Sequence, residues 1–194
     1  MHHIYTTKAI IIKSIPIGEA NKYYFFLTED LGFIRATAQS VRLDKSKLKG
    51  HLQDFCFVKI SLVKGKDIWR ITNVETIEAG NFLDDVNKLI CIKNIFALLL
   101  RLLHGEEKNE PLFRSIESFY NFLLKNDLSQ NSIKNLETIT VLRILYNLGY
   151  FKESFDLSDF VIDNELSLDK LNLFDDKKKT AILNINNALN ETHL

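Results

Sequence analysis

A run of positive side chains between residues 35 and 49 is the part of this sequence best suited to chemistry. It contains Asp44 as its only acid. Its five cations are Arg35, Arg42, Lys45, Lys47 and Lys49. Cationic side chains and the hydroxyls of Ser40 and Ser46 are groups that contact phosphate oxygens in protein–DNA interfaces. The run therefore predicts a DNA-binding loop, and the alternative is an ordinary solvated loop.

Aromatic residues flank this basic run on both sides. Tyr23, Tyr24, Phe33 and Trp69 lie on the segments before and after it. Proteins that bind single strands combine a basic groove with rings on which bases stack. We select Tyr24 and Trp69 as candidate DNA-binding rings. A small barrel also needs large residues inside, so the interpretation of these rings as core stays open.

Patterns that would indicate an enzyme or a metal centre are missing from the sequence. The five histidines form no HxxxH or HxH pattern, and Cys56 and Cys91 lie 35 positions apart without a CxxC. No glycine-rich phosphate-binding motif and no GxSxG is present. Adjacent carboxylates such as Asp84 and Asp85 fall at expected helix ends, where they stabilise the helix dipole. We expect a protein that is not an enzyme and has no metal and no cofactor.

Short apolar segments separated by turns dominate the first 80 residues. Alternating or β-branched patterns predict five strands, which cover residues 8–15, 23–27, 33–38, 55–63 and 68–77. Five strands at this spacing are typical of a small barrel. The interval 39–54 is the exception, because it is long, polar and basic. We expect a five-stranded barrel of the oligonucleotide-binding (OB) type with a long basic loop.

A helical period replaces the strand period after residue 80. Residues 89–103 are apolar on nearly every side, which predicts a helix in the middle of a bundle. Glu110-Pro111 and Ser132 are expected to begin two further helices, and Gly149 to end the second of them. A short helix is expected near residues 157–162, and Asp175 or Asp176 is expected to cap a last helix.

The two halves also differ in charge. Residues 1–80 hold 12 Lys and Arg against 8 Asp and Glu, whereas residues 81–194 hold 13 against 17. Such a sign change indicates parts with different partners. The fold class is therefore α+β, with an OB-fold DNA-binding domain at 1–80 and an all-α domain at 81–194. No membrane span and no signal peptide are expected, so the predicted location is cytoplasmic.

The order and spacing of several short pieces resemble the N-terminal domain of the RecO family of bacterial DNA repair proteins. These pieces are Ala9–Lys13, Ile17–Ala20, Phe26–Arg35, Ser40–Leu48 and Leu52–Phe55. Ser40 replaces the glycine of the family's Gly-x-Arg/Lys-x-x-x-Ser-x-Leu pattern, and Asp54 replaces the proline of its Leu-Gln-Pro-Phe. In the second half, Glu110–Phe113 and Leu145–Tyr150 resemble helical landmarks of the family.

The sequence departs from many family members in one region. They follow the Leu-Gly-Tyr element with four zinc-binding cysteines, whereas residues 155–168 of this chain contain no cysteine. The resemblance is thus to a short form without zinc.

The resemblance implies a mediator of DNA repair and recombination after DNA damage. Such proteins bind single- and double-stranded DNA, anneal complementary strands, and act with RecR to load RecA on DNA coated by single-strand-binding protein (SSB). It implies association with the nucleoid and a helical groove for the acidic C-terminal tail of SSB. Arg101, Arg114 and Arg143 are candidate carboxylate-binding residues there. The alternative function is an OB-fold adaptor between proteins that does not bind DNA directly.

Overall fold

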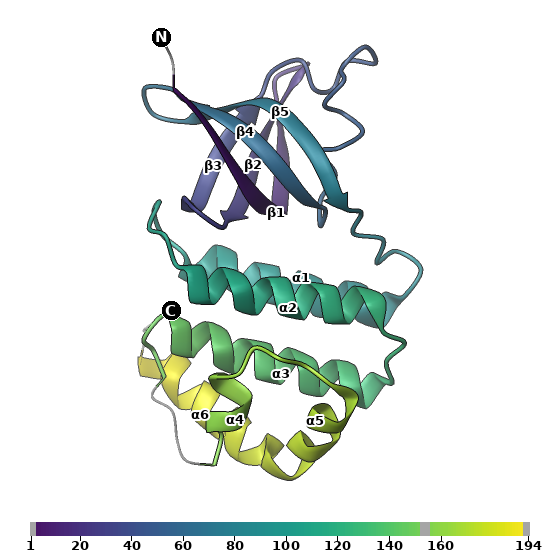
Figure 1. The fold of residues 1–194 in the computed structure, drawn as a ribbon, viewed down its shortest axis with the longest axis vertical. Coiled ribbons are helices and arrows are strands. Elements are labelled where there is room, and N and C mark those ends of the chain that lie inside the picture. The colour runs from purple at the N-terminus through teal and green to yellow at the C-terminus, as the bar shows by residue number, and fades with distance from the viewer. Residues whose placement is uncertain (1–2, 152–155, 192–194) are drawn as a thin grey trace. The chain divides into compact units, whose positions relative to one another are not determined.

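The structure is a computed structural model that describes residues 3–151 and 156–191. The chain divides into two compact units, a strand-rich one and a helical one (Figure 1). The first unit holds the residues up to Asn81 together with Leu103–Glu110. The second holds Phe82–Leu102 and the residues from Pro111 onward. The segment Leu103–Glu110, which joins two helices in sequence, thus belongs to the strand-rich unit.

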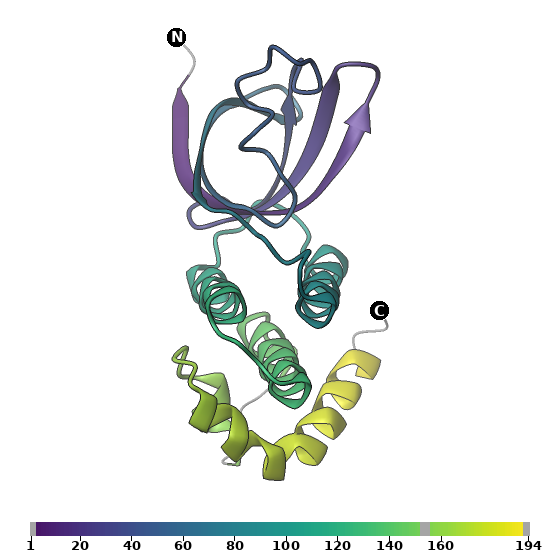
Figure 2. The same cartoon turned by 90° about the vertical axis from the view of Figure 1, so that its right-hand side faces the viewer.

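Five strands close into a barrel in the first unit (Figure 2). They are β1 (Ile4–Ile17), β2 (Asn21–Thr28), β3 (Gly32–Ala38), β4 (Phe57–Lys64) and β5 (Trp69–Glu78). Their order around the barrel is β1-β2-β3-β5-β4. The pairing of β3 with β5 is parallel, and the four other pairings are antiparallel. The predicted five-stranded OB-type barrel is confirmed.

Alternate side chains of each strand fill the barrel. Tyr24 and Phe26 of β2 point inward with Ile34 and Ala36 of β3, and all four are fully buried. Their neighbours along each strand point outward, because successive side chains of a strand alternate between its two faces. In β1 the register with β2 shifts between Ile11 and Lys13, which marks a β-bulge.

The interval between β3 and β4 is a long irregular loop, as the sequence predicts. Its turns run from residue 39 to residue 56 without a helix or a strand. Val41 and Leu52, near its two ends, are buried in the barrel core. The loop is therefore anchored by apolar side chains at both ends, while the cations between them lie at the surface.

The second unit is helical, in agreement with the expected fold class. Its helices are α1 (Val86–Leu102), α2 (Glu110–Lys125), α3 (Gln130–Asn147), α4 (Ser158–Val161), α5 (Leu168–Leu173), the 3-10 helix η1 (Phe174–Lys177) and α6 (Lys178–Glu191). The sequence did not predict α5. Among the described residues, no helix combines the length and the apolar character needed to cross a membrane.

The helix at the centre of this unit is α3, which corrects the prediction for residues 89–103. α3 packs against α1, α4, α5 and α6. α1 instead exposes Val86 and Ile90 on one side. Ser129 caps the N-terminus of α3, because its hydroxyl accepts a hydrogen bond from the backbone N–H of Ser132. The cap thus lies three residues before the predicted one. Gly149 ends it as expected, at φ +78°.

The side chain of Arg143 is buried, and its hydrogen bonds connect α3 to α4 and to the loop that follows α4. Its side chain is 1% exposed. The guanidinium donates hydrogen bonds to the carbonyl oxygens of Phe160, Asp163, Asn164 and Glu165, with an Nε–O distance of 2.8 Å to Phe160. Burial lowers the pKa of Arg143 to about 10, while nearby Asp163 raises it, so the group stays charged at neutral pH.

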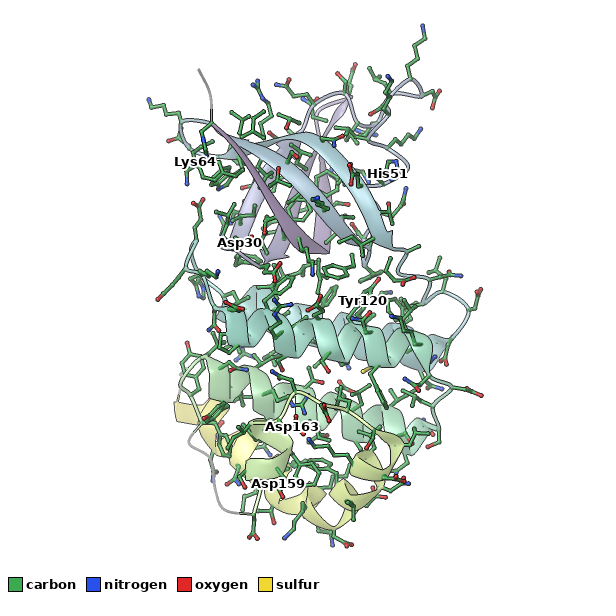
Figure 3. The ribbon with its side chains drawn as sticks, viewed as in Figure 1. Asp30, His51, Lys64, Tyr120, Asp159 and Asp163 are labelled. Atoms are coloured by element: carbon green, nitrogen blue, oxygen red, sulfur yellow. The ribbon has the colours of Figure 1, made fainter. Side chains whose placement is uncertain are left out.

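This arrangement corrects the expectation that Arg143 binds a carboxylate of a partner. Its donors hold the loop that follows α4, near Asp163 (Figure 3).

The prediction that Asp175 caps the last helix is also corrected. Its carboxylate accepts hydrogen bonds from the side-chain amides of Asn131 and Asn135. These bonds lower the pKa of Asp175 and tie η1 to α3. Asp175 and Asp176, the two predicted caps of the last helix, both lie inside η1, and α6 begins at Lys178.

Replacing Arg143 should destabilise the helical unit. Arg143→Met removes the guanidinium donor from the buried carbonyl oxygen of Phe160 and one donor from each of the three other carbonyl oxygens that it contacts. We expect the free energy of unfolding to fall by about 3 kcal/mol. Urea unfolding followed by circular dichroism measures this change. Arg114→Met is the control, because Arg114 is exposed on α2. A stability equal to that of the parent chain would contradict the connector role.

Candidate nucleic-acid interface

The outer face of β2, β3 and β5 carries two lateral rows of side chains. The pairing register places Tyr23 of β2 beside Thr37 of β3, and Thr37 beside Arg70 of β5. The second row places Phe25 of β2 between Lys13 of β1 and Arg35 of β3. Directly paired residues point to the same side of a sheet. Each row thus combines one aromatic ring with at least one cation.

The rings and cations of this outer face contact one another. The centroids of Tyr23 and Phe25 lie 5.3 Å apart in an edge-to-face arrangement, and the guanidinium carbon of Arg35 lies 5.9 Å from the centroid of Phe25. Both rings are half-buried, while Lys13, Arg35 and Arg70 are exposed. An accessible ring beside a cation can stack on a base while the cation meets a phosphate.

Two hollows border the same face. One, of about 310 Å³, is lined by Tyr23, Phe33, Arg35, Asp67, Gly105 and Glu106. The other, of about 350 Å³, is lined by Thr37, Gln39, Val63, Lys64, Gly65, Ile68 and Arg70. In OB barrels the face of β2 and β3 together with the β1–β2 and β4–β5 loops is the place where oligonucleotides bind. In this chain the two rows of side chains and the two hollows lie on that face and beside the β4–β5 loop.

The two rings selected from the sequence point to the other side of their strands. Tyr24 is fully buried, and its hydroxyl donates a hydrogen bond to the carbonyl oxygen of Leu52 at 3.4 Å. Trp69 is 3% exposed, and its Nε1 donates to Oε1 of Glu106 at 2.9 Å. Lys64, labelled in Figure 3, lies with its Nζ 4.5 Å from the centroid of Trp69.

Tyr24 and Trp69 therefore fill the barrel, and the stacking role proposed for them from the sequence is not supported. Their adjacent residues Tyr23 and Arg70 carry the accessible groups instead. Phe25, which the sequence reasoning missed, belongs to the same face. These residues can be identified from the pairing of β2 with β3. Ile34 and Ala36 of β3 are fully buried, so their partners Phe26 and Tyr24 point inward, and the residues between them point outward.

Two of the loop cations meet a third cation at another hollow. This cavity of about 310 Å³ is lined by Lys22, Tyr24, Val41, Arg42, Lys49, Leu52 and Gln53, and we name it the loop hollow. Lys45 and Lys47 are exposed but do not line it. The structure thus brings Arg42 and Lys49 together with Lys22, while Arg35 belongs to the outer face.

Hydrogen bonds attach the start of the loop to the turn between β1 and β2 and to the first residue of β2. The backbone N–H of Ser40 donates to Oδ1 of Asn21 at 2.8 Å. The backbone N–H of Arg42 donates to the carbonyl oxygen of Ala20 at 2.9 Å, and its Nη1 donates to that of Gly18 at 2.8 Å. Arg42 is therefore held in place before any ligand arrives.

The remaining candidate arginines lie on helices of the second unit. Arg101 is exposed in the last turn of α1. Arg114 is exposed on α2, where its Nη1 donates to Oε2 of Glu117 at 3.1 Å. Within the described residues, no cluster of three or more His, Cys, Asp or Glu residues that could hold a metal ion is found.

Fold and site together define an OB-type barrel with a basic, ring-bearing outer face, joined to a helical unit. Comparison with known proteins gives the family. Residues 1–79 match the family model described as "Recombination protein O N terminal". The chain is therefore similar to the RecO family, whose N-terminal model covers its first 79 residues.

Several relatives carry the name "DNA repair protein RecO". That of Dehalococcoides mccartyi strain 195 is 46% identical over 77 residues, which are 40% of this chain and 30% of the relative. That of Clostridium novyi is 32% identical over 149 residues, 76% of this chain and 57% of the relative. That of Acetivibrio thermocellus is 26% identical over 145 residues, which are 74% of this chain and 57% of the relative. The chain thus spans from about a third to just over half of the length of these relatives.

Among solved structures, the asparaginyl-tRNA synthetase of Entamoeba histolytica aligns with a TM-score of 0.34 and 11% identity. This alignment covers 78% of this chain and 34% of that chain. The likeness is too weak to indicate a shared fold.

The inward position of Tyr24 predicts an alkaline dependence of stability. Burial, and to a smaller extent Asp54, raises the pKa of Tyr24 above its usual value near 10. Above pH 10 the unfolded chain loses this proton and the folded chain keeps it. Protonated Tyr24 therefore makes its full contribution to the free energy of unfolding well below pH 10. About 1 kcal/mol of this contribution is lost between pH 9 and pH 11.

Tyr24→Phe removes the titrating hydroxyl, so we expect this variant to lose less stability than the parent chain when the pH rises from 9 to 11. Urea unfolding at the two pH values measures the difference. Tyr23→Phe, on the outer face, is the matched control for the removal of one hydroxyl. Equal losses in Tyr24→Phe and the parent chain would place Tyr24 outside the barrel core.

Proposed function

We propose that this chain acts in DNA repair and recombination by binding single-stranded DNA on the outer face of β2, β3 and β5. Bases stack on Tyr23 and Phe25, and the cations of the two rows meet the phosphates. The role is one of binding, without catalysis. The proposal places the protein in the cytoplasm, associated with the nucleoid.

The single observation that supports this proposal most is the register of the barrel. It aligns two accessible rings along β2 with Arg35 and Arg70 on the neighbouring strands. The similarity to relatives named DNA repair protein RecO supports it independently. Exposed Lys45 and Lys47 of the β3–β4 loop add positive charge that attracts any DNA backbone, single- or double-stranded.

The finer steps of the proposal follow the family resemblance. The protein anneals complementary strands and, with RecR, helps to load RecA on DNA coated by SSB. The acidic tail of SSB binds to the helical unit, where Arg101 and Arg114 offer exposed guanidinium groups. Arg143 is removed from this set because backbone carbonyls occupy its donors.

A protein–protein adaptor without direct DNA binding is the second candidate. The overall formal charge of zero favours it, because a DNA-binding protein usually carries a net positive charge. The half-buried rings of the outer face could equally contact a protein. DNA affinity and its dependence on salt separate the two candidates.

Binding of single-stranded DNA should weaken steeply with salt. We expect a dissociation constant of about 1 μM or tighter at low salt, because each neutralised phosphate releases counterions. Fluorescence anisotropy with a labelled oligothymidylate at two salt concentrations measures this dependence. Affinity that is absent, or that stays constant between the two salts, would favour the adaptor.

Charge reversal of the loop tests its part in annealing. The triple variant Arg42→Glu, Lys45→Glu and Lys47→Glu should remain folded and lose strand annealing, because the loop then repels phosphates. A matched control reverses three exposed lysines of the helical unit, namely Lys125, Lys134 and Lys179. The control has the same net charge and should keep annealing if the position of the charges matters. Normal annealing by the loop variant would exclude the loop from the site.

Truncation of the rings tests the outer face itself. Tyr23→Ala or Phe25→Ala should each weaken the binding of single-stranded DNA by about 1–3 kcal/mol, the usual contribution of one stacked base. The measurement is anisotropy at low salt, after circular dichroism has shown that the variants are folded. Ile77→Ala removes an exposed apolar side chain of β5 and is the control. If all three variants bind like the parent chain, the bases do not stack on this face.

A further inference from the structure

The loop hollow is a recess at one mouth of the barrel. Lys22 and Tyr24 follow the inward side of β2 toward its first residue, and Val41 and Leu52 of the β3–β4 loop are buried beside them. Tyr24, Val41 and Leu52 thus form an apolar floor. The charged groups of Lys22, Arg42 and Lys49 belong to the rim, because Arg42 and Lys49 are exposed and Lys22 is half-buried.

The walls of this recess are fixed from two sides. The turn between β1 and β2 holds Arg42 through hydrogen bonds to Ala20 and Gly18. On the other wall, the side-chain amide of Gln53 donates to the carbonyl oxygen of Lys49 at 3.1 Å, and the hydroxyl of Tyr24 donates to that of Leu52. A pocket whose shape exists before binding loses little entropy when a ligand enters.

The cations of the rim keep donors for an anion. One hydrogen bond engages Nη1 of Arg42, and a guanidinium has five N–H donors. Lys49 pairs with Asp44 at 2.8 Å, but the Asp44 side chain is 98% exposed. An exposed ion pair of this kind is weak and can exchange for a phosphate. Lys22 lies with its Nζ 6.0 Å from the centroid of Tyr24, at the edge of the floor.

The recess adjoins the outer face that we propose for DNA. Phe25, Tyr23 and Lys22 follow one another along β2 toward this mouth of the barrel. A strand that stacks on Phe25 and then on Tyr23 reaches the loop hollow by passing over the first residues of β2, where Lys22 points inward. The buried residues bound the recess on its inner side, and a recess with such a floor admits the end of a chain more readily than a chain that continues.

We propose that the loop hollow binds the terminal phosphate of a DNA strand, with the attached nucleotide on the apolar floor. A phosphate monoester carries a charge of about −1.5 to −2 at neutral pH, whereas a phosphodiester within a strand carries one negative charge. Three cations at the rim suit the higher charge. A volume of about 310 Å³ is at the small end of ligand pockets and suits one nucleotide. This inference rests on the proposed function.

Three oligothymidylates of equal length test the proposal with the full chain. They carry a 5′-phosphate, a 3′-phosphate or hydroxyl groups at both ends, and an internal fluorophore reports binding. We expect one phosphorylated strand to bind about tenfold tighter than the hydroxyl strand, a difference of the size given by one additional charge-assisted contact. The preferred strand also gives the polarity of the DNA on the barrel.

Two kinds of variant locate the effect. Arg42→Gln and Lys22→Gln should each reduce the preference for the phosphorylated strand toward unity. Lys47→Gln is the matched control, because Lys47 belongs to the same loop but does not line the hollow. It should lower the affinity for all three strands by the same factor. A preference that survives in both hollow variants would place the phosphate elsewhere and overturn the proposal.

The outcomes also separate this inference from the function on which it rests. Equal and tight binding of all three strands would overturn the strand-end site and leave DNA binding intact. If none of the three strands binds, both the strand-end site and the proposed DNA-binding function are wrong. Free thymidine monophosphate serves as a competitor. If it displaces the phosphorylated strand at equal molar concentration, the hollow is a site for free nucleotides and the strand-end assignment is wrong.

Discussion

The alternation of side chains along the strands of a closed barrel is the constraint on which the rest of the structure depends. Because the barrel has an inside and an outside, a residue on a strand either fills the core or meets solvent and ligands. Inward Tyr24 and outward Tyr23 have similar chemistry and opposite roles. A shift of one residue in register would exchange the two sets completely. The pairings of β2 with β1 and β3 set that register, and the pairing of β1 with β4 closes the barrel.

Much of the fold could be predicted from local patterns. The five strands, the long basic loop and the helical second half each have a signal within a few residues of sequence. The inward or outward direction of the rings could not be predicted in the same way. Residues 23–26 are all aromatic, so no alternation of polar and apolar residues indicates which of them face the core. Trp69 is held by Glu106, which lies 37 residues away in sequence. Arg143 is buried by carbonyl oxygens about 20 residues away.

Ser40 has a strained backbone conformation. Its φ is +54°, in the left-handed region, at the position where the family resemblance leads us to expect glycine. A non-glycine residue there costs roughly 1 kcal/mol. The hydrogen bond from Ser40 to Asn21 holds the strained conformation. The strain lies two residues before Arg42, so the same turn positions the cation at the loop hollow.

The central claim is that the bases of a bound DNA strand stack on the outward side of β2. Photo-crosslinking of a single-stranded oligothymidylate to the full chain, followed by mass spectrometry of the peptides, tests it directly. For a strand with hydroxyl groups at both ends, the account predicts crosslinks at Tyr23 and Phe25 and none at Trp69. Crosslinks concentrated at Trp69, with none at Tyr23 or Phe25, would show that the barrel opens or that the register differs. Either finding would contradict the account.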